Sequence, residues 1–194
     1  MPQVSTQEFE RLPLRVHTFL AGVPLHDVWA VDLPRVRAGI TLDEFLRVSG
    51  ALPYRPSPVV RALLGFRFFV GRLLGWDRET DRTARQTFAT RLTTADISRS
   101  LAPAGAREGP FRMVYRFEDE QLLELSNRTA HAAALSALVE TAGAYRFYFG
   151  VYVRSVSRWT PVYMTLIDPF RKLLVYPSLL RSVQTTWNQT FGVA

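Results

Sequence analysis

The feature that most constrains the fold is a long alternation of apolar and polar residues in the second half of the chain. It runs from Phe111 to Phe117 and returns in "AYRFYFGVYVRSVSRW" (144–159). A repeat of two residues is the repeat of a β-strand, whose successive side chains point to opposite faces of a sheet. Short polar stretches at 118–120 and 126–128 are typical of tight turns. We therefore expect an antiparallel meander that is apolar on one face.

The alternation also predicts which side chains share a face. In the first strand of the meander, one face carries Phe111, Met113, Tyr115 and Phe117. In "TAHAAALSALV" (129–139), one face carries His131, Ala133, Leu135, Ala137 and Val139. In the last strand, the apolar face carries Tyr145, Phe147, Phe149, Val151, Val153 and Trp159. Its polar face carries Arg146, Tyr148, Tyr152, Arg154 and Arg158. We interpret these arginines as solvated, with an anionic binding surface as the alternative.

The first half of the chain predicts one strand and two helices. "LHDVWAVDLP" (25–34) alternates and is closed by a proline, so we expect a strand there. "TLDEFLRVSG" (41–50) begins with a capping box and stops at a glycine, which indicates a short helix. A second amphipathic helix is expected over 57–75. The polar, aperiodic stretch 77–109 predicts a long connection, with room for a short helix or strand inside it.

The segment after residue 159 predicts one long helix. Thr160 suits an N-cap and Pro161 suits the first helical position. Apolar residues then recur at spacings of three and four, as in an amphipathic helix of about 27 residues, about 40 Å long. This stripe comprises Tyr163, Leu166, Phe170, Leu173, Pro177, Leu180 and Trp187. Because it continues through Pro169 and Pro177, we expect these prolines to bend the helix rather than end it.

Composition narrows the class of protein. The chain has 194 residues, which suits a single domain over 1–194, and 47% of them are apolar. It has no cysteine, which excludes disulfides, thiolate metal sites and a cysteine nucleophile. Its three histidines are far apart in sequence, so no metal and no cofactor are expected. The formal net charge is +7, but the arginines are scattered singly, so we expect no nucleic-acid partner.

Targeting signals are not recognisable. The first fifteen residues lack a positive segment followed by an apolar core, so no secretory signal is expected. No uncharged apolar stretch of about 18 residues occurs, and the nearest, 63–76, is interrupted by Arg67 and Arg72. The default expectation is a cytoplasmic protein without a transmembrane helix.

Three stretches carry a resemblance to a known superfamily. They are "HDVWAVDLP" (26–34), the strand pair that ends at His131, and "LIDPFRKLLVYPSLLRSV" (166–183). Together with the element order, they resemble the START/SRPBCC (birch-allergen-like) superfamily, and in particular a bacterial family of unknown function assigned to it. The resemblance implies an α+β helix-grip fold. In that fold a curved antiparallel sheet wraps around a long C-terminal helix, two shorter helices follow the first strand, and a cavity lies between sheet and helix.

The chain departs from this family's pattern at two places. Members often carry an acidic pair and then Arg-His-Leu before the third sheet strand, whereas here only His131 matches. Arg128 and Thr129 replace the acidic pair, and Ala132 replaces the leucine. Members also often have a histidine after Pro-Phe in the last helix, where this chain has Arg171.

The implied cavity leads to three functional hypotheses. The first is binding of a small hydrophobic or amphipathic molecule, such as a lipid, between sheet and helix. The second is an enzyme of the cyclase, hydrolase or dehydratase kind found in the superfamily, using His131 with Tyr115 or Tyr163. The third is binding to a membrane surface through basic amphipathic helices at 57–75 or 161–188. The candidate cavity-lining residues are Trp29, Tyr115, His131, Phe149, Trp159, Tyr163 and Phe170. Whether the chain is an enzyme stays open.

His131 has two interpretations. Inside a cavity it would bind a ligand oxygen or act as a general base. The alternative is a hydrogen-bonded histidine of the core or of a turn, which we favour because no acidic residue stands beside it in the sequence.

No pair of carboxylates in the sequence resembles a catalytic pair. Glu118, Asp119 and Glu120 fall in a hairpin turn, where we expect them to be solvated. Asp168 is expected to pair with Lys172, which follows it by one helical turn.

Overall fold

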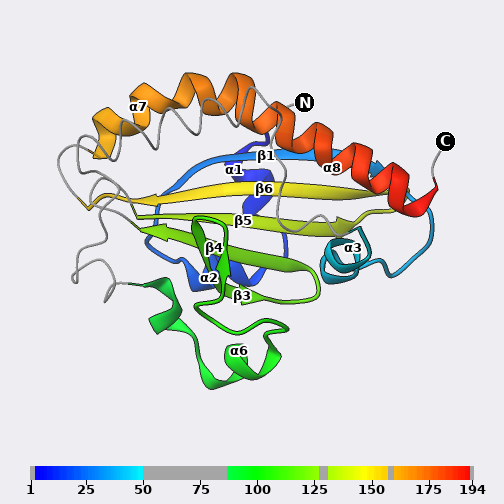
Figure 1. Cartoon of the computed structure of the whole chain (residues 1–194), viewed down its shortest axis with the longest axis horizontal. Coiled ribbons are helices and arrows are strands. Elements are labelled where there is room, and N and C mark those ends of the chain that lie inside the picture. Colours follow the sequence, from blue (N-terminus) through cyan, green and yellow to red (C-terminus); the bar gives the residue numbers. More distant parts are fainter. Residues whose placement is uncertain (1–2, 50–86, 127–130, 157–159, 193–194) are drawn as a thin grey trace.

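The alternating segments form one antiparallel sheet in the computed structural model, which describes residues 3–49, 87–126, 131–156 and 160–192, except for the side chains of 161–163 and 166. The curved six-stranded sheet has the order β1-β6-β5-β4-β3-β2 (Figure 1). Its strands are β1 (Leu25–Pro34), β2 (Arg107–Glu108), β3 (Phe111–Arg116), β4 (Glu120–Ser126), β5 (His131–Glu140) and β6 (Ala144–Arg154). The predicted meander and the first strand are therefore confirmed, and β1 returns to pair with β6.

Helices flank this sheet and make the fold α+β. They are α1 (Thr6–Glu10), α2 (Arg15–Phe19), α3 (Leu42–Ser49), the 3₁₀ helix η1 (Phe88–Arg91), α6 (Thr94–Arg99), α7 (Thr160–Phe170), the π-helical turn η2 (Arg171–Val175) and α8 (Tyr176–Phe191). The predicted helix over 41–50 is α3, and Thr41 Oγ1 accepts a hydrogen bond from Glu44 N at 3.1 Å. Among the described helices, none is long and apolar enough to cross a membrane.

Several expectations lie on other parts of the chain. The helix expected over 57–75, the turn at 126–128 beyond Ser126, and Trp159 lie outside the described residues. Of the connection expected over 77–109, the part from residue 87 onward is described, and it contains η1, α6 and the short strand β2. The N-terminal helices α1 and α2 were not predicted, because five residues are too few to show a helical repeat.

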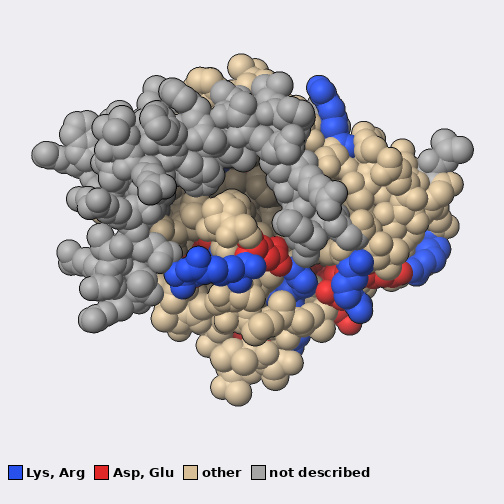
Figure 2. Space-filling model, in the orientation of Figure 1, with Lys and Arg blue, Asp and Glu red and all other residues tan. Residues whose placement is uncertain are grey.

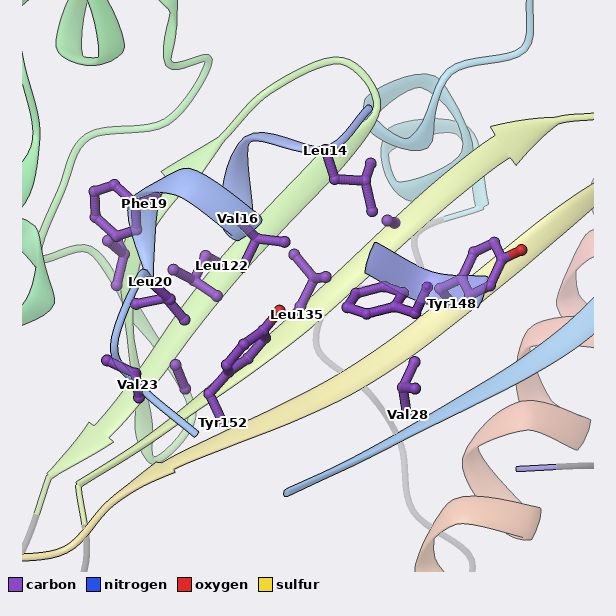
Figure 3. Packing of buried hydrophobic residues seen from close by; sticks show 14 of the residues in the cluster. Leu14, Val16, Phe19, Leu20, Val23, Val28, Leu122, Leu135, Tyr148 and Tyr152 are labelled. Atoms are coloured by element: carbon purple, nitrogen blue, oxygen red, sulfur yellow. The ribbon is translucent and has the colours of Figure 1, made fainter. Parts of the chain in front are cut away.

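Both faces of the sheet are covered, which corrects the expectation of one apolar and one solvated face. Tyr148 and Tyr152, assigned to the polar face of the last strand, are only 3% and 5% exposed. They pack in a cluster with residues of α1 and α2, including Val16 (Figure 3). The C-terminal helix lies against the other face, where Phe147 and Val151 are buried. A strand buried on both faces belongs to the middle of a three-layer arrangement.

On the face of β6 that α1 and α2 cover, the basic side chain of Arg146 pairs with a neighbouring element. Arg146 donates from Nη1 to Glu8 Oε1 of α1 at 2.9 Å, and its guanidinium lies over the Tyr148 ring, 5.6 Å from the centroid. Arg154, at the end of the same strand, is exposed as expected. Figure 2 shows basic and acidic side chains next to one another on the face it displays. On the displayed face, charge is therefore interleaved rather than gathered by sign.

A β-bulge in β3 changes the faces expected for its residues. Met113 pairs with Leu123, whereas Tyr115 pairs with Leu122, because the register shifts between them. Adjacent residues of a strand point to opposite faces, so Met113 and Tyr115 lie on opposite faces of the sheet. The prediction that they share a face was wrong because a bulge inserts one unpaired residue, which a strict repeat of two does not anticipate.

The C-terminal helix runs from Thr160 to Phe191 and continues through Pro169 and Pro177, as predicted. Between these prolines the helix widens into the π turn η2. A proline has no N–H to donate to the carbonyl four residues earlier. A π turn just before Pro177 is one way in which a helix adjusts its hydrogen bonds around such a residue.

The π turn changes which residues face the sheet. Tyr176, Leu180 and Trp187 are buried, as is Met164 before the turn. The expected stripe residues Phe170 and Leu173 are instead 50% and 74% exposed. A π turn contains about one residue more than an α turn. The sheet-facing positions on its two sides, Arg171 and Tyr176, are therefore five residues apart instead of three or four. The predicted stripe is correct only on the C-terminal side of this step.

A matched pair of substitutions tests this register. Leu180→Ala should lower the free energy of unfolding by about 2–5 kcal/mol, because Leu180 is fully buried. Leu173→Ala should change it by less than about 0.5 kcal/mol, because Leu173 is largely exposed. Urea denaturation measures both, and the two variants share the same change in helix propensity. Equal losses would mean that Leu173 faces the sheet and that the π turn is absent.

Candidate functional site

Polar side chains meet beneath the C-terminal helix, where β1 begins. His26 Nε2 lies 2.9 Å from Asp168 Oδ1 and 3.1 Å from Asp168 Oδ2. Arg171 donates from Nη1 to Asp168 Oδ1 at 3.1 Å and from Nη2 to the Tyr176 hydroxyl. The same Nη2 lies 3.5 Å from Asp27 Oδ2. We call these five residues the β1–η2 cluster.

Two irregularities of the backbone place this cluster. In β1 the register shifts between Leu25, which pairs with Tyr152, and Asp27, which pairs with Val151. Asp27 pairs in register with the rest of β1 and so shares the Trp29 face, toward the C-terminal helix. The bulge leaves His26 without a strand partner beside Asp27 and places Leu25 on the other face. The π turn brings Arg171 to the sheet-facing side of the helix. Such bulges and π turns occur frequently at functional sites.

Asp27 is the least compensated group of the cluster. Its side chain is fully buried, and neither carboxylate oxygen accepts a hydrogen bond among the described residues. Burial raises the pKa of Asp27, although the charges of Arg171 and His26 and the neighbouring Tyr176 hydroxyl oppose this effect. A buried carboxylate without hydrogen bonds costs free energy, so its retention needs an explanation.

Asp168 behaves differently because its partners are close. Burial alone would raise the pKa of Asp168, but the hydrogen bond from His26 and the charge of Arg171 outweigh it, and the pKa is lowered. Lys172 Nζ lies 3.4 Å from Asp168 Oδ2, which confirms the predicted pair one turn apart. Burial also raises the pKa of the Tyr176 hydroxyl, which stays protonated at neutral pH.

The buried apolar contact between sheet and helix divides into two clusters at the same place. One cluster joins the sheet to α3 and α8 around Leu180 and Trp187, and a second joins it to α7 at Met164 and to the start of α8 at Tyr176. No residue of the π turn between them is buried. Trp29 and Phe149 pack against both clusters but are themselves only partly buried. Their rings lie 5.5 and 5.6 Å from the Tyr176 ring, and the indole N–H of Trp29 has no hydrogen-bond partner in the described chain.

A separate polar group surrounds His131 on the opposite face of the sheet. The imidazole is 1% exposed, and its Nε2 lies 3.0 Å from Glu124 Oε2. Glu124 also accepts a hydrogen bond from the backbone N–H of Phe88 at 2.8 Å, and the Phe88 ring stacks on the imidazole at 3.9 Å. An enzyme that uses His131 needs an imidazole open to a substrate, and this imidazole is enclosed.

Glu120 is also buried on that face, which corrects the expectation of a solvated turn residue. It accepts hydrogen bonds from the Tyr115 hydroxyl at 3.0 Å and from Val16 N at 3.5 Å. Val16 is in the first turn of α2, and Phe88 is the first residue of η1. The carboxylates of Glu120 and Glu124 therefore hold the starts of the two short helices that cover this face.

The structure does not bring the seven candidate residues together. Trp29 and Phe149 face the C-terminal helix, whereas Tyr115 and His131 belong to the opposite face. Phe170 is half-exposed on the outer side of the helix. Trp159 and the side chain of Tyr163 lie outside the described residues.

Sequence reasoning missed most of the β1–η2 cluster. His26 and Asp27 come from the stretch 26–34, and Asp168, Arg171 and Tyr176 come from 166–183. These are two of the three stretches that carry the resemblance to a known superfamily. The sequence therefore contained the five residues within two recognised motifs, but only the folded structure shows that they contact one another.

Comparison with known families gives one match. A family model described as "Protein of unknown function (DUF2867)" matches residues 19–178, which include the whole β1–η2 cluster. No curated protein and no solved structure shows a significant match to the chain.

Glu120 generates a testable pH dependence. Burial raises the folded-state pKa of Glu120 from its usual 4.5 to about 7, so the native state holds a proton that the unfolded state releases more readily. This stabilisation is complete below pH about 4.5 and is lost as the pH rises through 7. Between pH 5 and 8 the native chain should therefore lose about 3 kcal/mol of unfolding free energy relative to Glu120→Gln, measured by urea denaturation.

Glu118→Gln, which changes an exposed residue two positions away, is the matched control and should leave the pH dependence unchanged. Parallel curves for the native chain and Glu120→Gln would show that Glu120 is not protonated in the folded state near neutral pH.

Proposed function

Because the chain belongs to the DUF2867 family, whose function is unknown, its activity has to be inferred from geometry, and we propose that it binds a small amphipathic molecule. The proposed position is between the sheet and the C-terminal helix, at the π turn η2. In this proposal the fold is a helix-grip of the START/SRPBCC kind. The curved antiparallel sheet and the long C-terminal helix that lies against it support that assignment.

The observation that carries the proposal is the partly buried aromatic surface beneath η2, where no residue of the π turn is itself buried. Trp29, Phe149 and Tyr176 offer aromatic surface there, and two of the three are only partly buried. Ligand sites usually combine such apolar surface with a few placed polar groups. The indole N–H of Trp29 lacks an acceptor, and a buried donor of this kind usually has one. The proposed ligand therefore has an apolar body and an oxygen atom that accepts a hydrogen bond from Trp29.

Replacement of Trp29 tests this function. A lipophilic dye, 1-anilinonaphthalene-8-sulfonate, should bind the native chain saturably and be displaced by 1-decanol, which has an apolar body and a hydroxyl oxygen. Trp29→Phe keeps an aromatic ring but removes the N–H, so it should weaken decanol binding by about five- to tenfold. Displacement titrations measure the change, with thermal unfolding as a check that the variant is folded.

Leu173→Ala, on the outer side of the same turn, is the matched control and should bind decanol as the native chain does. The proposal would be refuted by a crystal structure in which side chains completely fill the space between Trp29 and η2. Native mass spectrometry that detects only the unliganded chain, with no saturable dye binding, would refute it as well.

A second candidate function is binding to a membrane surface. Phe170, Leu173 and Leu174 are 50%, 74% and 38% exposed on the outer side of the π turn, and Lys172 lies among them. Large apolar side chains next to a basic one are the residue types that bind at the boundary between lipid headgroups and acyl chains. The π turn is the reason that these side chains point away from the sheet.

Flotation with vesicles tests this candidate. At low salt the native chain should float with vesicles that contain anionic phosphatidylserine, and a Phe170→Ser, Leu173→Ser double variant should remain in the soluble fraction. Val48→Ser is a suitable control, because Val48 is 61% exposed on α3, away from the π turn. Absence of the native chain from the floated fraction at low salt would eliminate the candidate.

A further inference from the structure

We propose that His26, Asp27 and Asp168 form a binding site for a divalent transition-metal cation of the Zn²⁺ or Mn²⁺ type. This inference does not rest on the proposed ligand, because it concerns the polar side of the β1–η2 cluster rather than the aromatic surface beside it. The three residues come from two ends of the chain, β1 and α7, and are adjacent only in the folded molecule.

The distances suit a single ion. One imidazole nitrogen and one oxygen from each carboxylate all lie within 4.8 Å of one another. Zinc binds imidazole nitrogen and carboxylate oxygen at about 2.0–2.2 Å, so ligand atoms on one ion lie about 3–4 Å apart. Small side-chain movements would bring the ligand atoms from within 4.8 Å of one another to that spacing. Three protein ligands with one open position is the arrangement of zinc sites that bind water or a substrate.

Asp27 is the independent reason to expect a ligand here. Its side chain is fully buried, and neither of its oxygens accepts a hydrogen bond within the described chain. Arg171, its nearest cation, lies 3.5 Å away and already donates to Asp168 and Tyr176. A metal ion bound to Asp27 would satisfy a carboxylate that the described protein leaves without a hydrogen bond.

The donor types indicate which ion. One imidazole and two carboxylates suit Zn²⁺ and Mn²⁺, whereas Mg²⁺ and Ca²⁺ prefer sites made entirely of oxygen. The nitrogen that would bind the ion is Nε2 of His26, which lies against both oxygens of Asp168. The side chains of His26 and Asp168 are 27% and 20% exposed, so an ion has access from solvent.

Lys172 is expected to compete with a metal ion for Asp168. Arg171 and Lys172 supply two positive charges beside the two carboxylates. Lys172 Nζ lies 3.4 Å from Asp168 Oδ2, and its side chain is 41% exposed. It can therefore leave for water when an ion arrives, whereas Arg171 can keep its hydrogen bond to Asp168 and orient that carboxylate.

Titration of the metal-free full-length chain with ZnCl₂ and MnCl₂ tests the proposal by calorimetry and by thermal unfolding. The native chain should bind one equivalent and melt at a higher temperature with the ion. His26→Ala and Asp168→Asn should each weaken binding by about tenfold to a hundredfold or more. Lys172→Ala should tighten it, by up to about tenfold, because a competing positive charge is removed.

Asp27→Asn separates a metal site from an ordinary ion pair. If Asp27 is a metal ligand, this variant should no longer respond to the ion. It should also melt at a higher temperature than the metal-free native chain, because a buried carboxylate without a hydrogen bond is removed. Asp32→Asn, on the same strand but with a side chain 74% exposed, is the control and should bind as the native chain does. The proposal is overturned if the native chain binds no ion at one equivalent, or if His26→Ala and Asp168→Asn bind it unchanged. It is also overturned if Asp27→Asn retains full binding.

Discussion

A sheet that is apolar on both faces must be covered twice, and most of the described structure depends on this constraint. In β6 the side chains of Phe147 and Val151 point to one layer, and those of Tyr148 and Tyr152 point to the other. The two covers come from opposite ends of the chain, α1 and α2 from the N-terminal end and α7 to α8 from the C-terminal end. Because the sheet separates them, each cover has its own polar groups, and the two sets cannot act on one ligand.

The two layers treat their buried carboxylates in different ways. Glu120 and Glu124 receive hydrogen bonds from the starts of α2 and η1 and so fix those short helices in place. In spite of burial, hydrogen bonds lower the pKa of Glu124, whereas burial still raises the pKa of Glu120. Asp27 receives no hydrogen bond, although it is buried as deeply. The first pair therefore has a structural explanation within the described chain. Asp27 has only the 3.5 Å ion pair with Arg171 and the neighbouring Tyr176 hydroxyl, which leave burial dominant.

Much of the fold could be predicted from the sequence, because strands show their pattern locally. The alternation in β1, β5 and β6 identified those strands and grouped their side chains by face. It did not predict that the face with Tyr148 and Tyr152 is covered. A strand face of tyrosines and arginines can be exposed to solvent or covered by a second layer. Here α1 and α2 cover it, and these helices are too short to show a helical repeat in the sequence.

The site was harder to predict, because its residues are placed by irregularities rather than by a repeat. The bulges in β1 and β3 and the π turn each shift a register by one residue. The bulge in β3 and the π turn each place side chains on a face other than the predicted one. Asp168 was expected only as the partner of Lys172, and Phe170 as a residue of the sheet-facing stripe. The structure turns Asp168 toward His26 and turns Phe170 outward.

The π turn gives the C-terminal helix two phases. Residues before Arg171 and after Tyr176 each follow the ordinary helical repeat. The extra residue of the π turn offsets the second repeat from the first by one position. A single-residue deletion within η2 would merge them into one phase and rotate α7 by about 100° relative to α8. Related chains that differ here by a gap of one residue would therefore present different faces of α7 to β1, even where every other residue is identical. In a comparison of two such chains, residues of α7 that align on identical amino acids would not occupy equivalent positions relative to β1 when a gap falls within 171–175.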